Sequence, residues 1–346
     1  MSKWILAIAF IFSLAVPASA MEIQAPAVPD SGAALMPRET GSFADGLMEL
    51  VRKGLGQLRP DLAEAARTGV TVIGAVMLVS VLRAASGQAR KAAELAGAVT
   101  IVAVLMSHTN AMIALGAETV QELSSYGRLL FPVMTSALAA QGGLTASAAL
   151  YAGTAAFDGI LASLISKFLV PGVYAFLALA AANGVTGEEL LKKLRDLVKT
   201  AISWCLKTLL TVFTTYMSIT GVVSGTTDAA ALKATKVTIS SVVPVVGGIL
   251  SDASEAVLVG AGLVKNAAGI YGILAVLAVF LEPFLKIGVQ YLMWKLTAAL
   301  CALFGSKPIT GLIEDFSAAM GLLLGMTGAA CLLLLISCIC FMKGVG

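Results

Sequence analysis

Apolar segments separated by short charged connections recur along most of this chain, and they constrain its fold more than any other feature. Charged residues make up only 12% of the sequence, whereas a soluble globular protein carries about 25%. So few charges cannot cover a water-soluble body of 346 residues, and several helices must therefore face lipid. We predict an all-α, polytopic integral membrane helix bundle with about seven transmembrane helices and one or two re-entrant or half-length segments. The predicted spans are 68–82, 95–115, 168–182, 202–223, 267–281, 287–304 and 318–341.

The first 20 residues have the pattern of a secretory signal peptide. Lys3 supplies the positive n-region, residues 4–16 form a short apolar core, and Pro17 precedes an Ala-Ser-Ala cleavage site. Cleavage is expected after Ala20. The alternative is an uncleaved first membrane helix, although spanning takes about 20 apolar residues and this run is shorter.

Residues 21–64 are predicted to form an exported linker, and residues 65–346 a polytopic transmembrane domain. The linker begins with a proline-containing stretch of mixed charge. Residues 42–58 carry apolar side chains at helical spacing and predict an amphipathic helix. Such a helix either lies on the membrane surface or packs on a partner. Its predicted apolar face consists of Phe43, Leu47, Leu50, Val51, Leu55 and Leu58.

Basic residues indicate the orientation in the membrane. Arg83, Arg90 and Lys91 lie in or beside the first connection between spans, and short basic loops face the cytoplasm under the positive-inside rule. With an exported N-terminus and seven spans, the C-terminus, with Lys343, is expected in the cytoplasm too.

Proline and glycine interrupt the apolar pattern. Pro132 and the following Gly142-Gly143 favour a re-entrant hairpin within 130–157, a structure tolerated at membrane depth only where protein or water covers the backbone. Glu282-Pro283 predicts a turn between two spans. Thr186 and Glu189 have capping-box spacing, and segment 186–199 is predicted to be a basic, cytoplasmic membrane-surface helix. An ordinary solvated helix is the alternative there.

The segment 224–269 is glycine-rich and too polar to face lipid all round. We expect two moderately apolar helices, separated near Pro244, that line a cavity or an interface. Elsewhere, Asp158 and Glu282 carry charges that are costly in lipid, which favours a pathway or interface role, whereas Lys167 and Lys286 are expected to snorkel. The candidate pore or interface residues are Asp158, Asp228, Lys233, Lys236, Pro244, Gly247, Gly248, Asp252, Glu255 and Glu282.

The sequence gives little support for an enzymatic function. The sequence has one histidine, His108, and no HExxH, CxxC, P-loop or GxSxG motif. All five cysteines lie in apolar segments and are read as small hydrophobic residues. We therefore predict no catalytic residue, no cofactor and no metal site. A net charge of +3 without a basic stripe also predicts no nucleic-acid partner.

Several short motifs resemble the stage III sporulation protein AE family. They are 224–228 (SGTTD), 233–236 (KATK), 243–248 (VPVVGG), 251–255 (SDASE), 280–283 (FLEP) and 314–317 (EDFS). The layout of signal peptide, exported linker and polytopic body fits as well, and the likeness covers most of the chain from about residue 62 onward.

The resemblance implies a membrane component of a secretion or feeding channel between the mother cell and the forespore. The resemblance also implies that the protein lies in the mother-cell membrane around the forespore and that late forespore development needs it. The implied partners are the other membrane proteins of the same sporulation operon and a forespore-side channel protein. The family carries over no catalytic residue. Whether the chain also forms a homo-oligomer is an open question.

Two other interpretations stay open. One is a stand-alone secondary transporter or permease, because transporters carry paired helix breaks near the midplane, and breaks are predicted near Pro132 and Pro244. The other is a membrane scaffold without a conduit. Transport by the purified protein alone would favour the transporter, and dependence on partners would favour the channel or the scaffold.

Overall fold

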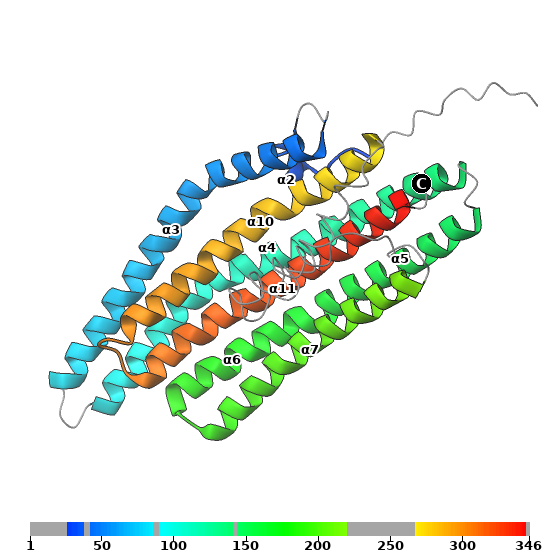
Figure 1. The fold of residues 1–346 in the computed structure, drawn as a ribbon. Helices are drawn as coiled ribbons and strands as arrows, with labels where there is room; N and C mark the ends of the chain where they lie inside the picture. Colours follow the sequence, from blue (N-terminus) through cyan, green and yellow to red (C-terminus); the bar gives the residue numbers. More distant parts are fainter. Residues whose placement is uncertain (1–25, 38–41, 86–89, 141–143, 220–266, 344–346) are drawn as a thin grey trace, which may run out of the picture.

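The computed structural model describes residues 26–37, 42–85, 90–140, 144–219 and 267–343. Within these ranges the chain is helical and contains no strand. Six helical stretches are long and apolar enough to cross a membrane, which confirms the predicted all-α polytopic fold (Figure 1). The elements are α2 (Asp30–Ala33), α3 (Phe43–Ala85), α4 (Arg90–Ala140), α5 (Leu144–Leu164), a π-helical turn η2 (Ile165–Leu169), α6 (Val170–Thr186), α7 (Glu189–Ile219), α10 (Ala267–Cys301) and α11 (Lys307–Lys343).

The helix α11 occupies the middle of the bundle (Figure 1). It contacts α10 and α4 most extensively, and also α5, α6 and α7. In its most apolar stretch, 94% of the residues are buried inside the protein. A helix that is apolar on every side is stable only where protein or lipid surrounds it, so the sequence of 318–341 suits this central position.

The helix α3 lies at the edge of the bundle and packs along α10. Glycines of α3 allow α3 and α10 to approach each other closely. A Cβ atom added to Gly46 would lie 2.6 Å from a methyl group of Leu274, and one added to Gly54 would lie 2.8 Å from a methyl group of Leu281. The predicted amphipathic segment 42–58 is the first part of this long helix. Within it, Phe43 and Leu50 are buried against the bundle.

The prediction of two spans at 267–281 and 287–304 is wrong, because α10 is one continuous helix across Glu282-Pro283. Pro283 removes a single helical hydrogen bond, and a helix packed among neighbours tolerates that loss. Lys286 pairs with Glu282 one turn away. Glu282 and Lys286, which were expected to mark a turn, thus neutralise each other on one helix. With α10 counted once, the described helices provide six candidate spans, whereas seven were predicted.

The capping box at Thr186 is also absent. Thr186 is the last residue of α6, and Gly187 follows in the left-handed region with φ of 72°, where glycine pays no Cβ penalty. The Thr186 hydroxyl accepts a 3.3 Å hydrogen bond from the Glu188 amide, not from that of Glu189. The helix α7 then continues to Ile219, so segment 189–199 is the first part of a spanning helix and not a separate surface helix.

The predicted re-entrant hairpin within 130–157 is replaced by two long helices. Pro132 lies inside α4, which continues to Ala140, and α5 begins at Leu144. From there the chain stays helical through η2 and α6 to Thr186. The irregularity around Lys167 is a π turn, which inserts one residue without ending a helix.

Helix ends gather at two opposite ends of the bundle. At one end, the Ser80 hydroxyl in α3 donates a 2.9 Å hydrogen bond to the Phe304 carbonyl before α11. At the other end, Gly269 of α10 lies against Met342 of α11. If the basic end beside Arg83 faces the cytoplasm, six spans put the end of α11 on the exported side, whereas the seven spans expected from the sequence put it in the cytoplasm. The predicted signal peptide lies outside the described residues.

Candidate functional site: charged groups within the helix bundle

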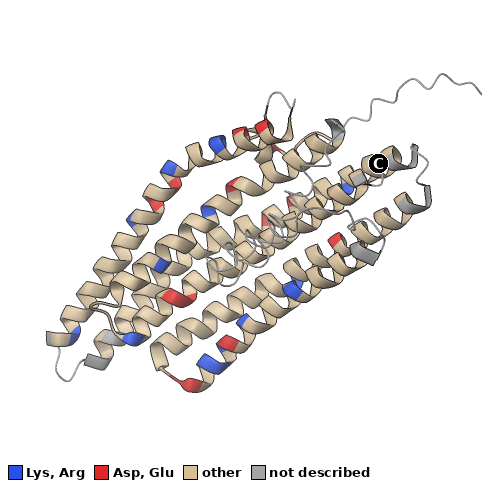
Figure 2. Cartoon of the chain, viewed as in Figure 1, with Lys and Arg blue, Asp and Glu red and all other residues tan. Residues whose placement is uncertain are grey.

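Eight of the ten predicted pore or interface residues lie outside the described residues. They are Asp228, Lys233, Lys236, Pro244, Gly247, Gly248, Asp252 and Glu255, all within 220–266. Asp158 and Glu282 are described, and they lie on different helices, α5 and α10. The charges within the described helices are few, and many of them lie on α3 and on the first part of α7 (Figure 2).

Asp158 is buried, with 4% of its surface exposed. The Ser124 hydroxyl of α4 donates a 2.7 Å hydrogen bond to its Oδ2 atom. The neighbouring Phe157 packs against Phe213 of α7, with 5.3 Å between ring centroids. Asp158 therefore makes a polar contact between α5 and α4 beside an aromatic contact with α7, which is an interface within the chain.

Glu282 and Lys286 form an ion pair on α10, with 2.7 Å between Oε1 and Nζ. Both side chains are one-third exposed. Lys286 also interacts electrostatically with Asp61 and Glu64 of α3. The Lys286 ammonium group thus has a carboxylate partner one turn away on its own helix, and its expected snorkelling stays a prediction.

A groove of about 510 Å³ opens beside this charged cluster, between α3 and α4. The Thr68 hydroxyl donates a 3.1 Å hydrogen bond to the Glu64 carbonyl and lies 3.2 Å from Nε2 of His108. The tautomer of the His108 ring decides which of the two groups donates in that contact. The groove is lined by Pro60, Ala63, Glu64, Arg67, Thr68, Thr71, Val104 and His108.

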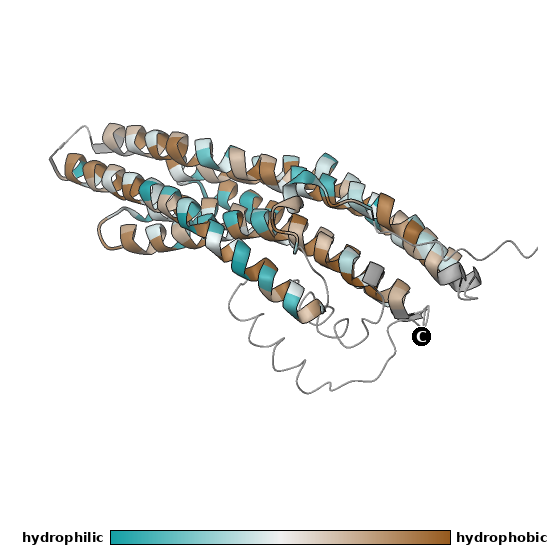
Figure 3. Cartoon of the chain, turned by 90° about the horizontal axis from the view of Figure 1, so that it is seen from above, coloured by the Kyte–Doolittle hydropathy of each residue, from teal (hydrophilic) through white to brown (hydrophobic). Residues whose placement is uncertain are grey.

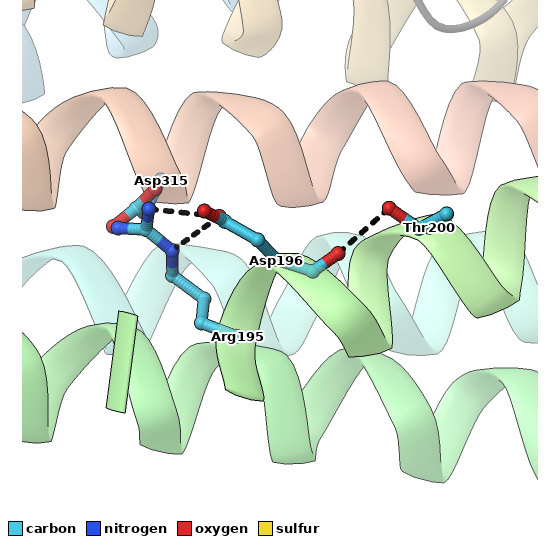
Figure 4. Close-up of polar contacts among 4 residues, drawn as sticks. All are labelled: Arg195, Asp196, Thr200 and Asp315. Atoms are coloured by element: carbon cyan, nitrogen blue, oxygen red, sulfur yellow. Dashed lines mark hydrogen bonds and ion pairs between the residues drawn. The ribbon is translucent and has the colours of Figure 1, made fainter. Parts of the chain in front are cut away.

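The sequence did not predict the ion pair that joins α7 to α11. Arg195 of α7 binds Asp315 of α11, and its guanidinium also binds the adjacent Asp196 (Figure 4). Arg195 lies within segment 186–199, which was predicted to be a basic surface helix. Glu314 and Asp315 are the only acidic residues of α11, so the cost of a carboxylate in lipid was the signal that could have pointed to a partner.

Hydrophobic residues line the helices along their whole length, with hydrophilic residues scattered between them (Figure 3). Among the described residues no group of three His, Cys, Asp or Glu side chains could hold a metal ion. The arrangement brings together carboxylates, one lysine, one histidine and hydroxyls between α3, α4 and α10. Such groups can exchange protons and hold water.

Comparison with known proteins gives the family. The family model for stage III sporulation protein AE matches residues 42–345. The chain is 24% identical over 200 residues to Stage III sporulation protein AE of Bacillus subtilis (strain 168). That match covers 58% of this chain and 50% of the relative, so it spans about half the relative's length. No solved structure matches the chain. Because the family model covers most of the sequence, the chain belongs to the stage III sporulation protein AE family.

Proposed function

We propose that this protein is a membrane subunit of a sporulation-specific secretion or feeding channel between the mother cell and the forespore. The family match over residues 42–345 carries the proposal. The six helices able to span a membrane support an integral position in the bilayer. The proposed location is the mother-cell membrane that surrounds the forespore, and the proposed role is non-catalytic.

The packing of the bundle favours a subunit over a self-sufficient pore. The central position is filled by α11, whose most apolar stretch is 94% buried. A buried helix at the centre of the described bundle supports a conduit whose walls come from more than one chain. The proposed partners are the other membrane proteins of the same sporulation operon and a forespore-side channel protein, with a homo-oligomer as a further arrangement.

The stand-alone transporter has less support. Its sequence argument relied on helix breaks near Pro132 and Pro244. Pro132 lies within the continuous helix α4, and Pro244 lies outside the described residues. One of the two breaks that would form a midplane site is thus absent.

The test is deletion of the gene in its host, with spore counts and a reporter for late forespore transcription. A block after engulfment with loss of that transcription supports the channel. Normal sporulation contradicts it. Affinity purification of the protein from sporulating wild-type cells then tests whether the operon partners co-purify with it. A stand-alone transporter would not require such partners.

A further inference from the structure

Polar side chains follow one another at successive turns of α10. They are Glu282, Lys286, Gln290 and Trp294, each four residues apart, followed by Thr297. Side chains four apart lie on the same side of a helix. The distance from the first to the last is about 22 Å at 1.5 Å per residue, compared with a hydrocarbon core of about 30 Å. The line of polar groups is therefore long enough to cross most of a bilayer.

The helix α3 follows this line. Lys286 interacts electrostatically with Asp61 and Glu64. Farther along, the Thr297 hydroxyl oxygen lies 2.8 Å from where a Cβ atom of Gly69 would be, so the two helices are close at that level. The groove that contains Glu64 and His108 opens at the charged end of the line. A volume of about 510 Å³ has room for several water molecules, since each occupies about 30 Å³ in the liquid.

Two buried donors in the line have no hydrogen-bond partner among the described residues. They are Nε2 of Gln290 and Nε1 of Trp294, on side chains from residues that are 7% and 0% exposed. Leaving a buried N–H unpaired destabilises a protein, and internal water commonly satisfies such groups. Both donors lie beyond Lys286 as the line continues towards Thr297.

The Trp294 ring packs on Phe316 of the central helix α11, with 5.9 Å between ring centroids. We infer that α10, with α3, α4 and α11 packed around it, holds a hydrated path along which protons cross the membrane through a single chain. Water in the groove exchanges protons with Glu64 and His108, which line it, and through them with the nearby Asp61, Glu282 and Lys286. Gln290 and Trp294 hold water farther along α10. One proton leaves for each that enters, so no other reactant is consumed. Because the path runs within one chain, it is separate from the multi-chain channel proposed above and does not depend on it.

The first test measures proton flux by the full chain in vesicles loaded with a pH-sensitive dye. Wild-type protein is expected to dissipate a pH step faster than protein-free vesicles. Gln290→Leu keeps the side-chain size but removes the polar group, and its flux is expected to fall to the protein-free rate. Ser337→Ala removes a buried hydroxyl that bonds the Leu333 carbonyl within α11, away from the line, and Lys295→Met removes an exposed charge from the same helix as the line. Both controls are expected to conduct like wild type.

Wild-type flux equal to that of empty vesicles overturns the inference, and so does unchanged flux in Gln290→Leu. A second measurement covers the case in which that variant fails to fold. The sequence has three tryptophans, so Trp4→Phe with Trp204→Phe leaves Trp294 alone. Its indole N–H is expected to exchange with D₂O within the time of an NMR experiment. Complete protection of that proton in the folded protein overturns the path.

Discussion

The guanidinium Nη1 of Arg195 lies 2.5 Å from Oδ2 of Asp315 and joins α7 to the central helix α11 (Figure 4). The two side chains are 12% and 14% exposed. Removing one partner of a buried ion pair leaves an uncompensated charge and costs about 3–5 kcal/mol. Because water reaches part of this pair, we expect Arg195→Met to lower stability by about 2–3 kcal/mol.

Thermal unfolding in detergent measures this effect. Arg195→Met combined with Asp315→Leu is expected to recover part of the loss, because no charge then remains unpaired. The matched control is Asp196→Asn, whose side chain is 56% exposed and whose pairing should contribute at most about 1 kcal/mol. Equal destabilisation by Asp196→Asn and Arg195→Met would contradict the importance of the link to α11.

The hydrogen bond from Ser124 to Asp158 should stabilise the packing of α5 on α4. Ser124→Ala leaves a buried carboxyl group without its donor, and we expect a loss of about 1–3 kcal/mol. Asp158→Asn keeps an oxygen that can accept from Ser124 and should cost less. The midpoint of thermal unfolding measures both. A larger loss for Asp158→Asn than for Ser124→Ala would show that the carboxylate charge, and not the hydrogen bond, matters there.

Gly97 of α4 lies where a Cβ atom would collide with the side chain of Val79 in α3. Gly97→Ala should force the helices apart and destabilise the protein by about 1–3 kcal/mol. Gly74→Ala is the control, because an added Cβ there meets nothing within 4 Å. It gains helix propensity without a clash and should stabilise by about 0.5–1 kcal/mol. The same sign for both substitutions in unfolding experiments would contradict the close approach of α3 and α4.

The C-terminal end of α11 is expected on the exported side of the membrane. Met342 lies beside Gly269, at the end opposite the basic residues Arg83 and Arg90, which the positive-inside rule places in the cytoplasm. A phosphatase fused after the last residue should therefore be active, and a fluorescent protein at the same position should be dark. A bright fluorescent fusion would restore the original prediction of a cytoplasmic C-terminus.

The segment 220–266 lies outside the described residues, and its predicted role as a pore lining or docking surface stays a prediction. Charge reversal by Asp252→Lys or Glu255→Lys is expected to lower spore yield, because either change inverts a charge at the proposed conduit. Glu188→Lys, an exposed reversal between α6 and α7, is the matched control. Normal spore yield with all three variants at wild-type protein levels would exclude the role proposed for Asp252 and Glu255.

Composition alone was enough to predict an all-α membrane protein, because a chain with 12% charged residues cannot cover a soluble surface. The sequence also contained the family motifs, and it identified Asp158 and Glu282 as charges that need partners in lipid. Those conclusions follow from composition and from the cost of burying charge, which every arrangement of the helices shares.

The ends of the helices and the pairing of the charges depend on how the helices pack. Pro283 and Thr186 resemble boundaries in sequence, but packing against neighbours keeps α10 continuous, and Gly187, not Thr186, supplies the conformation that ends α6. The pairs Arg195–Asp315 and Ser124–Asp158 join residues 120 and 34 positions apart. No local pattern encodes such contacts, because they depend on how α11 and α4 pack against the helices around them.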